Sequence, residues 1–343
     1  MNAELDLKDK KIIHFLSLNA RESDSRIAKE VELSRAAVTY RIKKLERLGV
    51  IRKYVSWINT FQLGYNNFHI YLKLRNFSQE KQEKIITIIK NNPNIKWLVS
   101  IGWPYDLFFV MSAKDLRELD LKLKELYANF EEDILSTKIF VVDSIIKDIP
   151  PFFPELVKHS KTHDTAPFRK NNKLDEIDVN ILNILSENAR FNVVEVASIL
   201  KKKIKSITPE AVSYRLKRMK KDGLLKKYSA DLDYRKLNLQ WFMIIFKFNK
   251  ISEEFDRKIK LHLRTRDKVN YIDKTMDHQI RFQILARSLE EVNEEIINIR
   301  NIFESSIEEY EVLPLFEQYV LTTLPKAIYE DLLSSVKHQK KSQ

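Results

Sequence analysis

A pattern of residues occurs twice in this chain. Residues 5–21 (LDLKDKKIIHFLSLNAR) match residues 174–190 (LDEIDVNILNILSENAR) at nine of 17 positions. Residues 38–45 (VTYRIKKL) are repeated as residues 212–219 (VSYRLKRM), so the offset between the copies grows from 169 to 174 residues. This spacing is too long for a solenoid unit, which has roughly 20 to 50 residues. The sequence therefore predicts a duplicated domain arrangement, and we expect the molecule to do twice whatever one copy does.

Each copy begins with residues that predict three short helices. Asp6 and Asp175 are expected to cap the first helix, because a carboxylate suits the positive N-terminal end of a helix. Ser34 should cap the third helix of the first copy, and in the second copy Thr208 precedes a proline at the first helical position. The remaining expected features are second helices near residues 26–31 and 194–200 and helix stops at Gly49 and Gly223.

Beyond each helix stop, the sequence predicts a small wing and then a βαββαβ unit. The alternation of strands and helices is typical of an α+β sheet with ferredoxin-like topology. Residues 107–111 are apolar on both sides, so we expect both faces of that sheet to be covered, one of them by the sheet of the other copy. The expected wing strands are residues 50–54, 55–59, 224–228 and 229–233. The expected strands and helices of the two units are residues 68–74, 78–91, 96–101, 107–112, 114–129 and 135–148, and then 241–248, 253–266, 269–274, 280–286, 289–303 and 307–321.

Composition and periodicity also suggest domain boundaries. Four of the nine prolines lie between the copies in a stretch without helical or strand periodicity, which is typical of a linker. The C-terminal residues are expected to form a frayed basic tail. The predicted division is a helix-turn-helix domain (1–64), a sheet domain (65–149), a linker (150–173), a second helix-turn-helix domain (174–238), a second sheet domain (239–325) and the tail (326–343).

The net charge of +12 is concentrated at equivalent places in the two copies. Residues 34–54 contain seven basic side chains against one acidic, and residues 201–228 contain eleven against two. The remainder of the chain is slightly acidic as a result. Positive charge focused in this way is typical of a surface that binds a polyanion, although a solvated lysine-rich surface is the alternative.

The third helix of each copy carries the candidate DNA contacts. If Val38, Ile42 and Leu45 are buried, the opposite side presents donors, cations and a tyrosine, which suit the major groove of B-DNA. Packing against a neighbouring element is the alternative for Tyr40 and Tyr214. The residues expected to face bases are Arg35, Thr39, Tyr40 and Lys43, with Ser213, Tyr214 and Lys217 in the second copy. The residues expected at phosphates are Arg41, Lys44, Arg47, Arg52 and Lys53, and the second copy adds Arg215, Arg218 and Lys221 to the DNA-binding set.

The two third helices differ where they begin. Pro209 and Glu210 stand where the first copy has Arg35 and Ala36. Because the N-terminal half of a recognition helix contacts the bases, the two copies should not prefer the same bases. The sequence therefore predicts double-stranded DNA as partner and an asymmetric binding site.

Several chemical classes do not fit the composition. The chain has no cysteine, which excludes disulfides, thiolate zinc sites and a cysteine nucleophile. Its seven histidines show no metal-ligand spacing, so we expect no metal site and no cofactor. Without an apolar run long enough for a bilayer and without a signal-peptide pattern, the chain is expected to be cytoplasmic, with no membrane partner.

The order of these motifs resembles a known family. The run from Leu5-Asp6 through Leu33-Ser34 and Gly49-Val50-Ile51 to Leu63-Gly64-Tyr65 is similar to the DNA-binding domain of Lrp/AsnC-type transcriptional regulators. The βαββαβ unit resembles their ligand-sensing RAM domain. The resemblance implies two winged helix-turn-helix domains and two RAM-like domains arranged as an intramolecular pseudo-dimer, because family members usually carry one unit and dimerise through RAM sheets. It also implies a non-enzymatic regulator and a further homo-oligomer through the RAM-like domains as a candidate assembly.

The resemblance extends to an effector site. Ile101-Gly102-x-x-Tyr105-Asp106 is similar to the glycine-to-aspartate turn near which family members bind small effectors, typically amino acids. This implicates Gly102, Tyr105 and Asp106, although Asp106 could instead cap a tight turn. The second copy has Lys274-Thr275-Met276-Asp277 at this place, without the glycine, so the effector pocket is expected only in the first copy.

Two other functions are compatible with parts of the sequence. An architectural protein that coats DNA is favoured by the lysine run at residues 201–205, because such residues contact phosphates rather than bases. Sirohaem decarboxylases resemble the same regulator fold, occur as paired or fused units and carry a turn similar to Trp103-Pro104-Tyr105. Such an enzyme needs basic and histidine side chains around its tetrapyrrole, and only His69 and His262 lie within the expected sheet domains away from turns.

Overall fold

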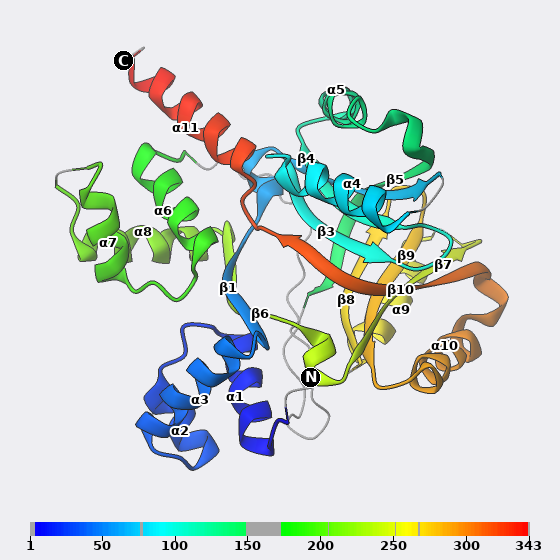
Figure 1. The fold of residues 1–343 in the computed structure, drawn as a ribbon, viewed down its shortest axis with the longest axis horizontal. Coiled ribbons are helices and arrows are strands. Elements are labelled where there is room, and N and C mark those ends of the chain that lie inside the picture. The colour runs from blue at the N-terminus through cyan, green and yellow to red at the C-terminus, as the bar shows by residue number, and fades with distance from the viewer. Residues whose placement is uncertain are drawn as a thin grey trace.

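The computed structural model describes residues 4–75, 78–148, 173–204, 206–250, 252–266 and 268–341. Two three-helix units lie on the same side of a closed barrel, and a two-stranded ribbon connects them to it (Figure 1). The predicted linker, residues 150–173, lies outside the described residues except for its last residue.

Both copies form the three expected helices, and their caps explain where they begin and end. The Asp6 carboxylate accepts a hydrogen bond from the backbone N–H of Asp9 at 2.8 Å, and the Asp9 carboxylate accepts one from Asp6 in return. Gly49 and Gly223 follow the third helices with φ of 65° and 73°, a conformation that glycine adopts without strain. The helices are α1 (Leu7–Leu18), α2 (Asp24–Val31), α3 (Arg35–Arg47), α6 (Glu176–Glu187), α7 (Val193–Lys201) and α8 (Pro209–Lys221).

The wing differs from the expectation of two strands in each copy. Each copy contributes one continuous strand, β1 (Ile51–Ile58) or β6 (Leu225–Leu232), and the two strands pair antiparallel with each other. A tight hairpin within one copy needs turn residues with positive φ, usually glycine or asparagine. The sequence around Tyr54-Val55, where the turn is expected, contains neither of them. The two-stranded element, called here the ribbon, therefore joins the copies to each other.

The two βαββαβ units together form the barrel, which confirms the expected α+β fold. The strand order is β3-β4-β2-β5 in the first copy and β8-β9-β7-β10 in the second. The copies join at two seams, where β5 pairs with β8 and β10 pairs with β3, both antiparallel. The strands are β2 (Asn66–Leu74), β3 (Ile95–Ile101), β4 (Leu107–Ala113), β5 (Ile134–Asp148), β7 (Gln240–Phe248), β8 (Val269–Thr275), β9 (Gln279–Ala286) and β10 (Ile307–Leu321). Short 3₁₀ turns η1 (Thr60–Leu63) and η3 (Tyr234–Leu237) connect the ribbon to the barrel, and η2 (Glu131–Asp133) and η4 (Glu304–Ser306) precede β5 and β10.

Apolar side chains are buried on both faces of each sheet. One face of each sheet packs against the helices of its own copy. The inner faces meet inside the barrel, where side chains from both copies, such as Phe108 and Trp241, share one core. This confirms that each sheet covers the other, as in a pseudo-dimer. The covering helices are α4 (Gln79–Asn91), α5 (Leu116–Tyr127), α9 (Glu253–Arg264) and α10 (Leu289–Phe303).

The expected frayed tail is instead helix α11 (Lys326–Lys341), which corrects the sequence prediction. Its apolar side chains include Ile328 and Val336, both at least nine-tenths buried, and Ile328 belongs to the core shared by the two helix-turn-helix units. The Tyr329 hydroxyl donates a hydrogen bond to Asn180 of α6 at 3.1 Å. The lysines near the end of the chain suggested a disordered tail, but the apolar residues of α11 follow an amphipathic helical pattern, and their packing stabilises the helix.

Candidate nucleic-acid interface

The third helix of each unit buries one face and exposes the other. Val38, Ile42 and Leu45 of α3 are buried, and Val212, Leu216 and Met219 are buried at the matching positions of α8. The opposite faces carry Tyr40 and Tyr214, which are 62% and 69% exposed. Both tyrosines therefore project into solvent and do not pack against a neighbouring element.

Cations accompany both exposed tyrosines. Arg35, Lys43 and Arg47 of α3 and Lys217 and Lys221 of α8 are exposed. Among the described residues, none of these five has an ion-pair partner. Unpaired cations beside an exposed aromatic hydroxyl can contact phosphates and base edges of a duplex. Lys44 and Ser213, the remaining exposed-face candidates, are half-buried.

Three arginines predicted to contact DNA instead connect helices within a unit. Arg41 contacts the capping carboxylates Asp6 and Asp9, each at 2.7 Å. In the second unit, Arg215 contacts Asp178 at 2.7 Å as well as Asp175, and Arg218 also contacts Asp178. Burial opposes ionisation of Asp6, but the Asp9 N–H and Arg41 together lower its pKa. These guanidinium groups therefore form ion pairs that connect the third helix of each unit to the first helix.

Three other predicted residues also have partners within the protein. Arg52 forms an ion pair with Asp233 at 3.1 Å, and Lys53 donates a hydrogen bond to the carbonyl of Leu321. The Thr39 hydroxyl donates to Asp24 at 2.6 Å. Arg52 and Lys53 of β1 therefore connect the first copy to Asp233 and Leu321 of the second copy. The sequence shows that Arg52 and Lys53 belong to the basic stretch at residues 34–54, but it does not reveal these partners.

Sequence reasoning missed the residues that connect the two units. Arg21 donates hydrogen bonds to the carbonyls of Ala189 and Phe191, both at 2.6 Å, and lies over the Tyr228 ring at 4.1 Å. The equivalent Arg190 forms an ion pair with Asp24 at 3.0 Å and lies over the Tyr54 ring. The signal was present in the sequence, because the same Asn-Ala-Arg stands at residues 19–21 and 188–190.

The predicted effector turn borders a cavity of about 390 Å³. Gly102 is required there, because a Cβ would lie 2.5 Å from the Pro314 ring of the other copy. Asp106 accepts a hydrogen bond from the backbone N–H of Leu74, at the end of β2, at 2.7 Å, and Tyr105 packs beside Tyr71. The structure thus brings all three predicted residues to one cavity wall.

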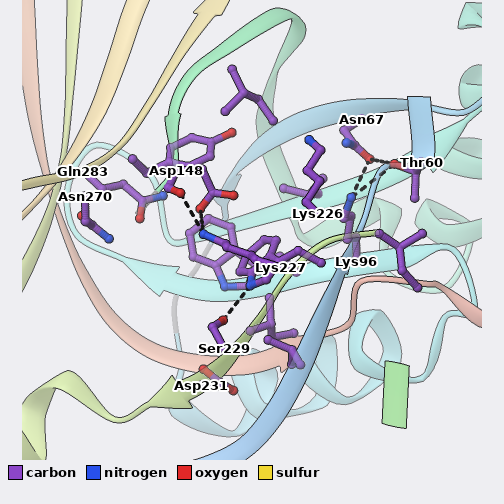
Figure 2. A pocket seen from close by; sticks show the side chains of 18 of the residues that line it. Thr60, Asn67, Lys96, Asp148, Lys226, Lys227, Ser229, Asp231, Asn270 and Gln283 are labelled. Atoms are coloured by element: carbon purple, nitrogen blue, oxygen red, sulfur yellow. Dashed lines mark hydrogen bonds and ion pairs between the residues drawn. The ribbon is translucent and has the colours of Figure 1, made fainter. Parts of the chain in front are cut away.

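A second cavity, of about 170 Å³, lies between the ribbon and the barrel and was not predicted. Figure 2 shows its polar side chains in two groups. Thr60, Asn67, Lys96 and Lys226 lie at one end, and Asp148, Asn270 and Gln283 lie at the other. Because residues of both copies line this cavity, no motif within a single copy could have indicated it.

Neither a helix able to cross a membrane nor a cluster of metal-ligating side chains occurs among the described residues. No helix in this part of the chain is both long and apolar enough to cross a membrane. No three acidic or histidine side chains within the same residues are grouped as ligands for a metal ion.

Family models match both helix-turn-helix units. The model of the AsnC-type helix-turn-helix domain matches residues 5–46, and a model described as winged helix-turn-helix DNA-binding matches residues 174–226. The crystal structure of the sirohaem decarboxylase NirDL in complex with an iron-uroporphyrin III analogue shares the whole architecture. It has a TM-score of 0.60 and covers 97% of this chain and 99% of its own. With 14% sequence identity, this likeness concerns the fold alone.

Similar curated proteins are transcriptional regulators about as long as one copy of the repeat. An uncharacterised HTH-type transcriptional regulator of Pyrococcus furiosus is 30% identical over 143 residues, which cover 42% of this chain and 95% of the relative. The HTH-type transcriptional regulator LrpA of Pyrococcus horikoshii is 29% identical over 154 residues, which cover 45% of this chain and 99% of the relative. The chain therefore belongs to the Lrp/AsnC family of HTH-type transcriptional regulators, and it carries the family's helix-turn-helix and RAM-like unit twice.

Proposed function

We propose that this protein regulates transcription by binding a specific sequence in double-stranded DNA with α3 and α8. The observation that carries the proposal is the equivalent position of an exposed tyrosine and unpaired cations on both helices. A solvated lysine-rich surface has no reason to follow the repeat in this way. The regulator names of the relatives support the same conclusion.

The contacts divide by chemistry. Arg35, Tyr40 and Lys43 on α3 face bases, as do Tyr214 and Lys217 on α8, because they lie on the exposed face of each helix. The cations nearer the helix end bind phosphates, which adds affinity without sequence information. These phosphate-binding residues are Lys44, Arg47 and Lys221.

The two half-sites of the DNA differ in sequence. Pro209 begins α8 and Glu210 follows it, whereas α3 begins with Arg35 and Ala36. Arginine pairs with guanine through two hydrogen bonds, and glutamate accepts one from cytosine, so the two helices prefer different bases. Replacing Arg35-Ala36 by Pro-Glu should change the preference of one half-site, and an unchanged preference at both would contradict this assignment.

The proposal is tested by selection from a randomised duplex pool at near-physiological salt. We expect one motif with two unequal half-sites about one helical turn apart, because paired recognition helices enter successive major grooves. Retention of DNA without an enriched motif would indicate the architectural alternative, since phosphate contacts alone give affinity without specificity. Failure to retain any DNA would overturn the proposed function.

A small effector bound at the turn cavity is the second part of the proposal. The cavity of about 390 Å³ bordered by Gly102, Tyr105 and Asp106 lies within the usual size of small-molecule sites. Amino acids are the first ligands to test, as the family resemblance implies. A thermal-shift screen of amino acids against the protein and Tyr105→Ala should show stabilisation only with the intact tyrosine.

Tetrapyrrole chemistry is the second candidate function, and it rests on the fold shared with NirDL. The cavity between ribbon and barrel does contain His69 and three lysines. Its volume of about 170 Å³ is below the range of about 300–1,000 Å³ that holds drug-sized ligands, and a tetrapyrrole is larger than most of these. A Soret shift on adding iron-uroporphyrin III would support the enzyme, and an unchanged spectrum would oppose it.

A further inference from the structure

The cavity between the ribbon and the barrel combines unpaired cations with apolar walls. Lys96 lies on β3 of the barrel, and Lys226 lies on β6 of the ribbon. The Lys96 ammonium is 3.3 Å from the Thr60 hydroxyl and 3.5 Å from the Asn67 side-chain oxygen, both of which are neutral. Lys226 has no hydrogen-bond or ion-pair partner among the described residues. Figure 2 shows both lysines at the same end of the cavity.

These two cations repel each other. Burial, and then the charge of Lys226, lower the pKa of Lys96 to about 7. Burial lowers the pKa of Lys226 to about 8, although Asp148 opposes this change. Two half-buried ammonium groups without a carboxylate in contact are costly in free energy. An anion between them would remove much of that cost.

The nearby acidic groups already have partners. Asp148 accepts a hydrogen bond from Lys227 at 2.8 Å, and Asp231 accepts two from Gln318 at 3.0 and 3.1 Å. These carboxylates are therefore engaged elsewhere in the cavity wall. Near neutral pH, pKa values of about 8 and about 7 leave Lys226 mostly protonated and Lys96 partly protonated, so the two ammonium groups suit an anion of single charge.

The rest of the cavity suits the apolar part of a small molecule. Three of the four tryptophans of the chain, Trp57, Trp97 and Trp241, lie in its wall. Their indole N–H groups donate to Ser229, Gln318 and Gln283 respectively, so the rings offer apolar and stacking contacts to a ligand. The Lys227 ammonium also lies over the Trp57 ring, 5.0 Å from its centroid.

Two buried amides point to a ligand independently of the lysines. The side-chain oxygens of Asn59 and Asn270 are buried and have no hydrogen-bond partner. Both residues are more than nine-tenths buried. An unsatisfied buried acceptor is rare in native proteins and costs about 1–3 kcal/mol. Because a carboxylate offers no N–H or O–H donor, a water molecule bound beside the ligand would satisfy such an oxygen.

We propose that this cavity binds a small monocarboxylate, whose carboxylate lies between Lys96 and Lys226 and whose aromatic or branched aliphatic group lies against Trp57, Trp97 and Trp241. The site differs in position from the turn at Gly102, and both copies contribute to it. The ligand contacts the ribbon through Trp57 and Lys226 and the barrel through Lys96, Trp97 and Trp241.

Binding at this junction affects the helix-turn-helix units, a consequence that rests on the proposed function. Only Leu48, Gly49 and Val50 separate α3 from β1, so an orientation imposed on the ribbon is passed to the recognition helix. If the ligand changes the affinity for DNA by some factor, DNA changes the affinity for the ligand by the same factor. Fluorescence anisotropy with and without ligand measures one direction, and calorimetry with and without DNA measures the other.

The direct test uses isothermal titration calorimetry on the full chain without DNA, so its result does not depend on DNA binding. The probes are 3-phenylpropionate and isovalerate, with inorganic phosphate for comparison. We expect one molecule of at least one carboxylate to bind per chain. Lys96→Met and Lys226→Met should each weaken binding about 10- to 100-fold, because each removes a charged hydrogen-bond donor. Lys90→Met, which changes an exposed lysine of α4, should bind like the unaltered protein.

Proton uptake provides a readout that needs no variant. Near pH 8, carboxylate binding should draw protons onto Lys96 and Lys226, so the observed heat should depend on the ionisation enthalpy of the buffer. Absence of carboxylate binding up to millimolar concentration would overturn the inference, as would equal affinity in both methionine variants or preference for phosphate. Carboxylate binding by a protein that fails to retain DNA would leave the inference standing and overturn the proposed function instead.

Discussion

At the scale of single residues, Arg281 shows how charge is accommodated inside the barrel. It is fully buried on β9 and donates two hydrogen bonds of 2.8 Å to Asp273 of β8. A third contact, also of 2.8 Å, reaches Nδ1 of His69 in the first copy. Burial and then the charge of Arg281 hold the pKa of His69 well below its usual range, so the neutral ring accepts this hydrogen bond. The arginine thus links the two sheets.

Removal of this arginine should destabilise the protein strongly. Arg281→Met leaves the Asp273 carboxylate buried without a counter-ion, which we expect to lower the free energy of unfolding by about 3–5 kcal/mol. The double replacement Arg281→Met with Asp273→Leu should recover part of this loss, because no charge is left unpaired. Urea denaturation of the two single variants and the double variant measures the coupling, and additive losses would contradict it.

The cavity lysines should make stability depend on pH. The pKa values of Lys96 and Lys226 are about 7 and 8 in the folded protein, below the ordinary value of 10.5. The unfolded chain therefore binds more protons between about pH 7 and 10.5, and stability rises with pH there by up to about 1.4 kcal/mol per pH unit for each lysine. Asp148, Lys227 and His69 also lie on the cavity wall, and burial holds the pKa of His69 well below this range. Thermal unfolding of the protein and of Lys96→Met/Lys226→Met from pH 7 to 9 should show the rise only with the lysines present.

At the scale of elements, α3 and α8 each contain two kinds of cation. Those on the exposed face, such as Lys43, have no ion pair among the described residues, whereas Arg41 and Arg215 contact the first helix of their unit. Charge alone does not distinguish the two kinds of cation, because both kinds occur within the basic stretches at residues 34–54 and 201–228. The separation depends on which side of the helix each residue occupies, and so on how the unit packs.

This difference predicts separate effects of two substitutions in α3. Lys43→Ala should reduce the slope of log affinity against log salt by about one, because one phosphate or base-edge cation is lost. Arg41→Ala should leave the slope unchanged and lower stability by about 1–3 kcal/mol, because the Asp9 carboxylate loses its partner. Anisotropy titrations at several salt concentrations, with thermal melts of both variants, distinguish the two effects. A reduced slope for Arg41→Ala would show that its ion pairs open on DNA.

Local signals account for most of the element boundaries. The cap at Ser34, the proline at position 209 and the stop at Gly223 act within one helical turn, so the sequence located these helices. The wing and α11 differ from the sequence prediction because their partners lie in the other copy or far along the chain. The candidate site divides in the same way. The sequence identified the exposed tyrosines, but not the arginines already paired, nor the cavity at the junction.

At the scale of the whole molecule, the two copies share apolar cores and are joined by strand pairing. A single apolar core runs through both helix-turn-helix units, and another lies between the two sheets. Strand pairing joins the copies at the ribbon and at both barrel seams. The inner faces of the sheets, through which family members would dimerise, are therefore occupied within one chain.

Because the copies share these cores and strand pairs, we expect each half of the chain to fold stably only in complex with the other half. We expect residues 1–148 and 173–343, expressed together as two chains, to form a complex with one copy of each. Either half alone would expose the inner face of its sheet and an unpaired ribbon strand, which favours aggregation. Size-exclusion chromatography with light scattering checks the stoichiometry, and the full chain, expected to have the mass of one molecule, is the control. A half that is monomeric and folded alone would contradict the shared core.

The covalent connection between the copies has a consequence for how the molecule lies on DNA. In a pair of identical chains every substitution appears twice, and the complex is unchanged when it is turned end for end. Here the helix start at Arg35 could diverge from the start at Pro209 while the joined ribbon kept both units in register. If the two helices bind as proposed, the molecule has a polarity on the duplex, and its upstream and downstream sides present different surfaces to neighbouring proteins.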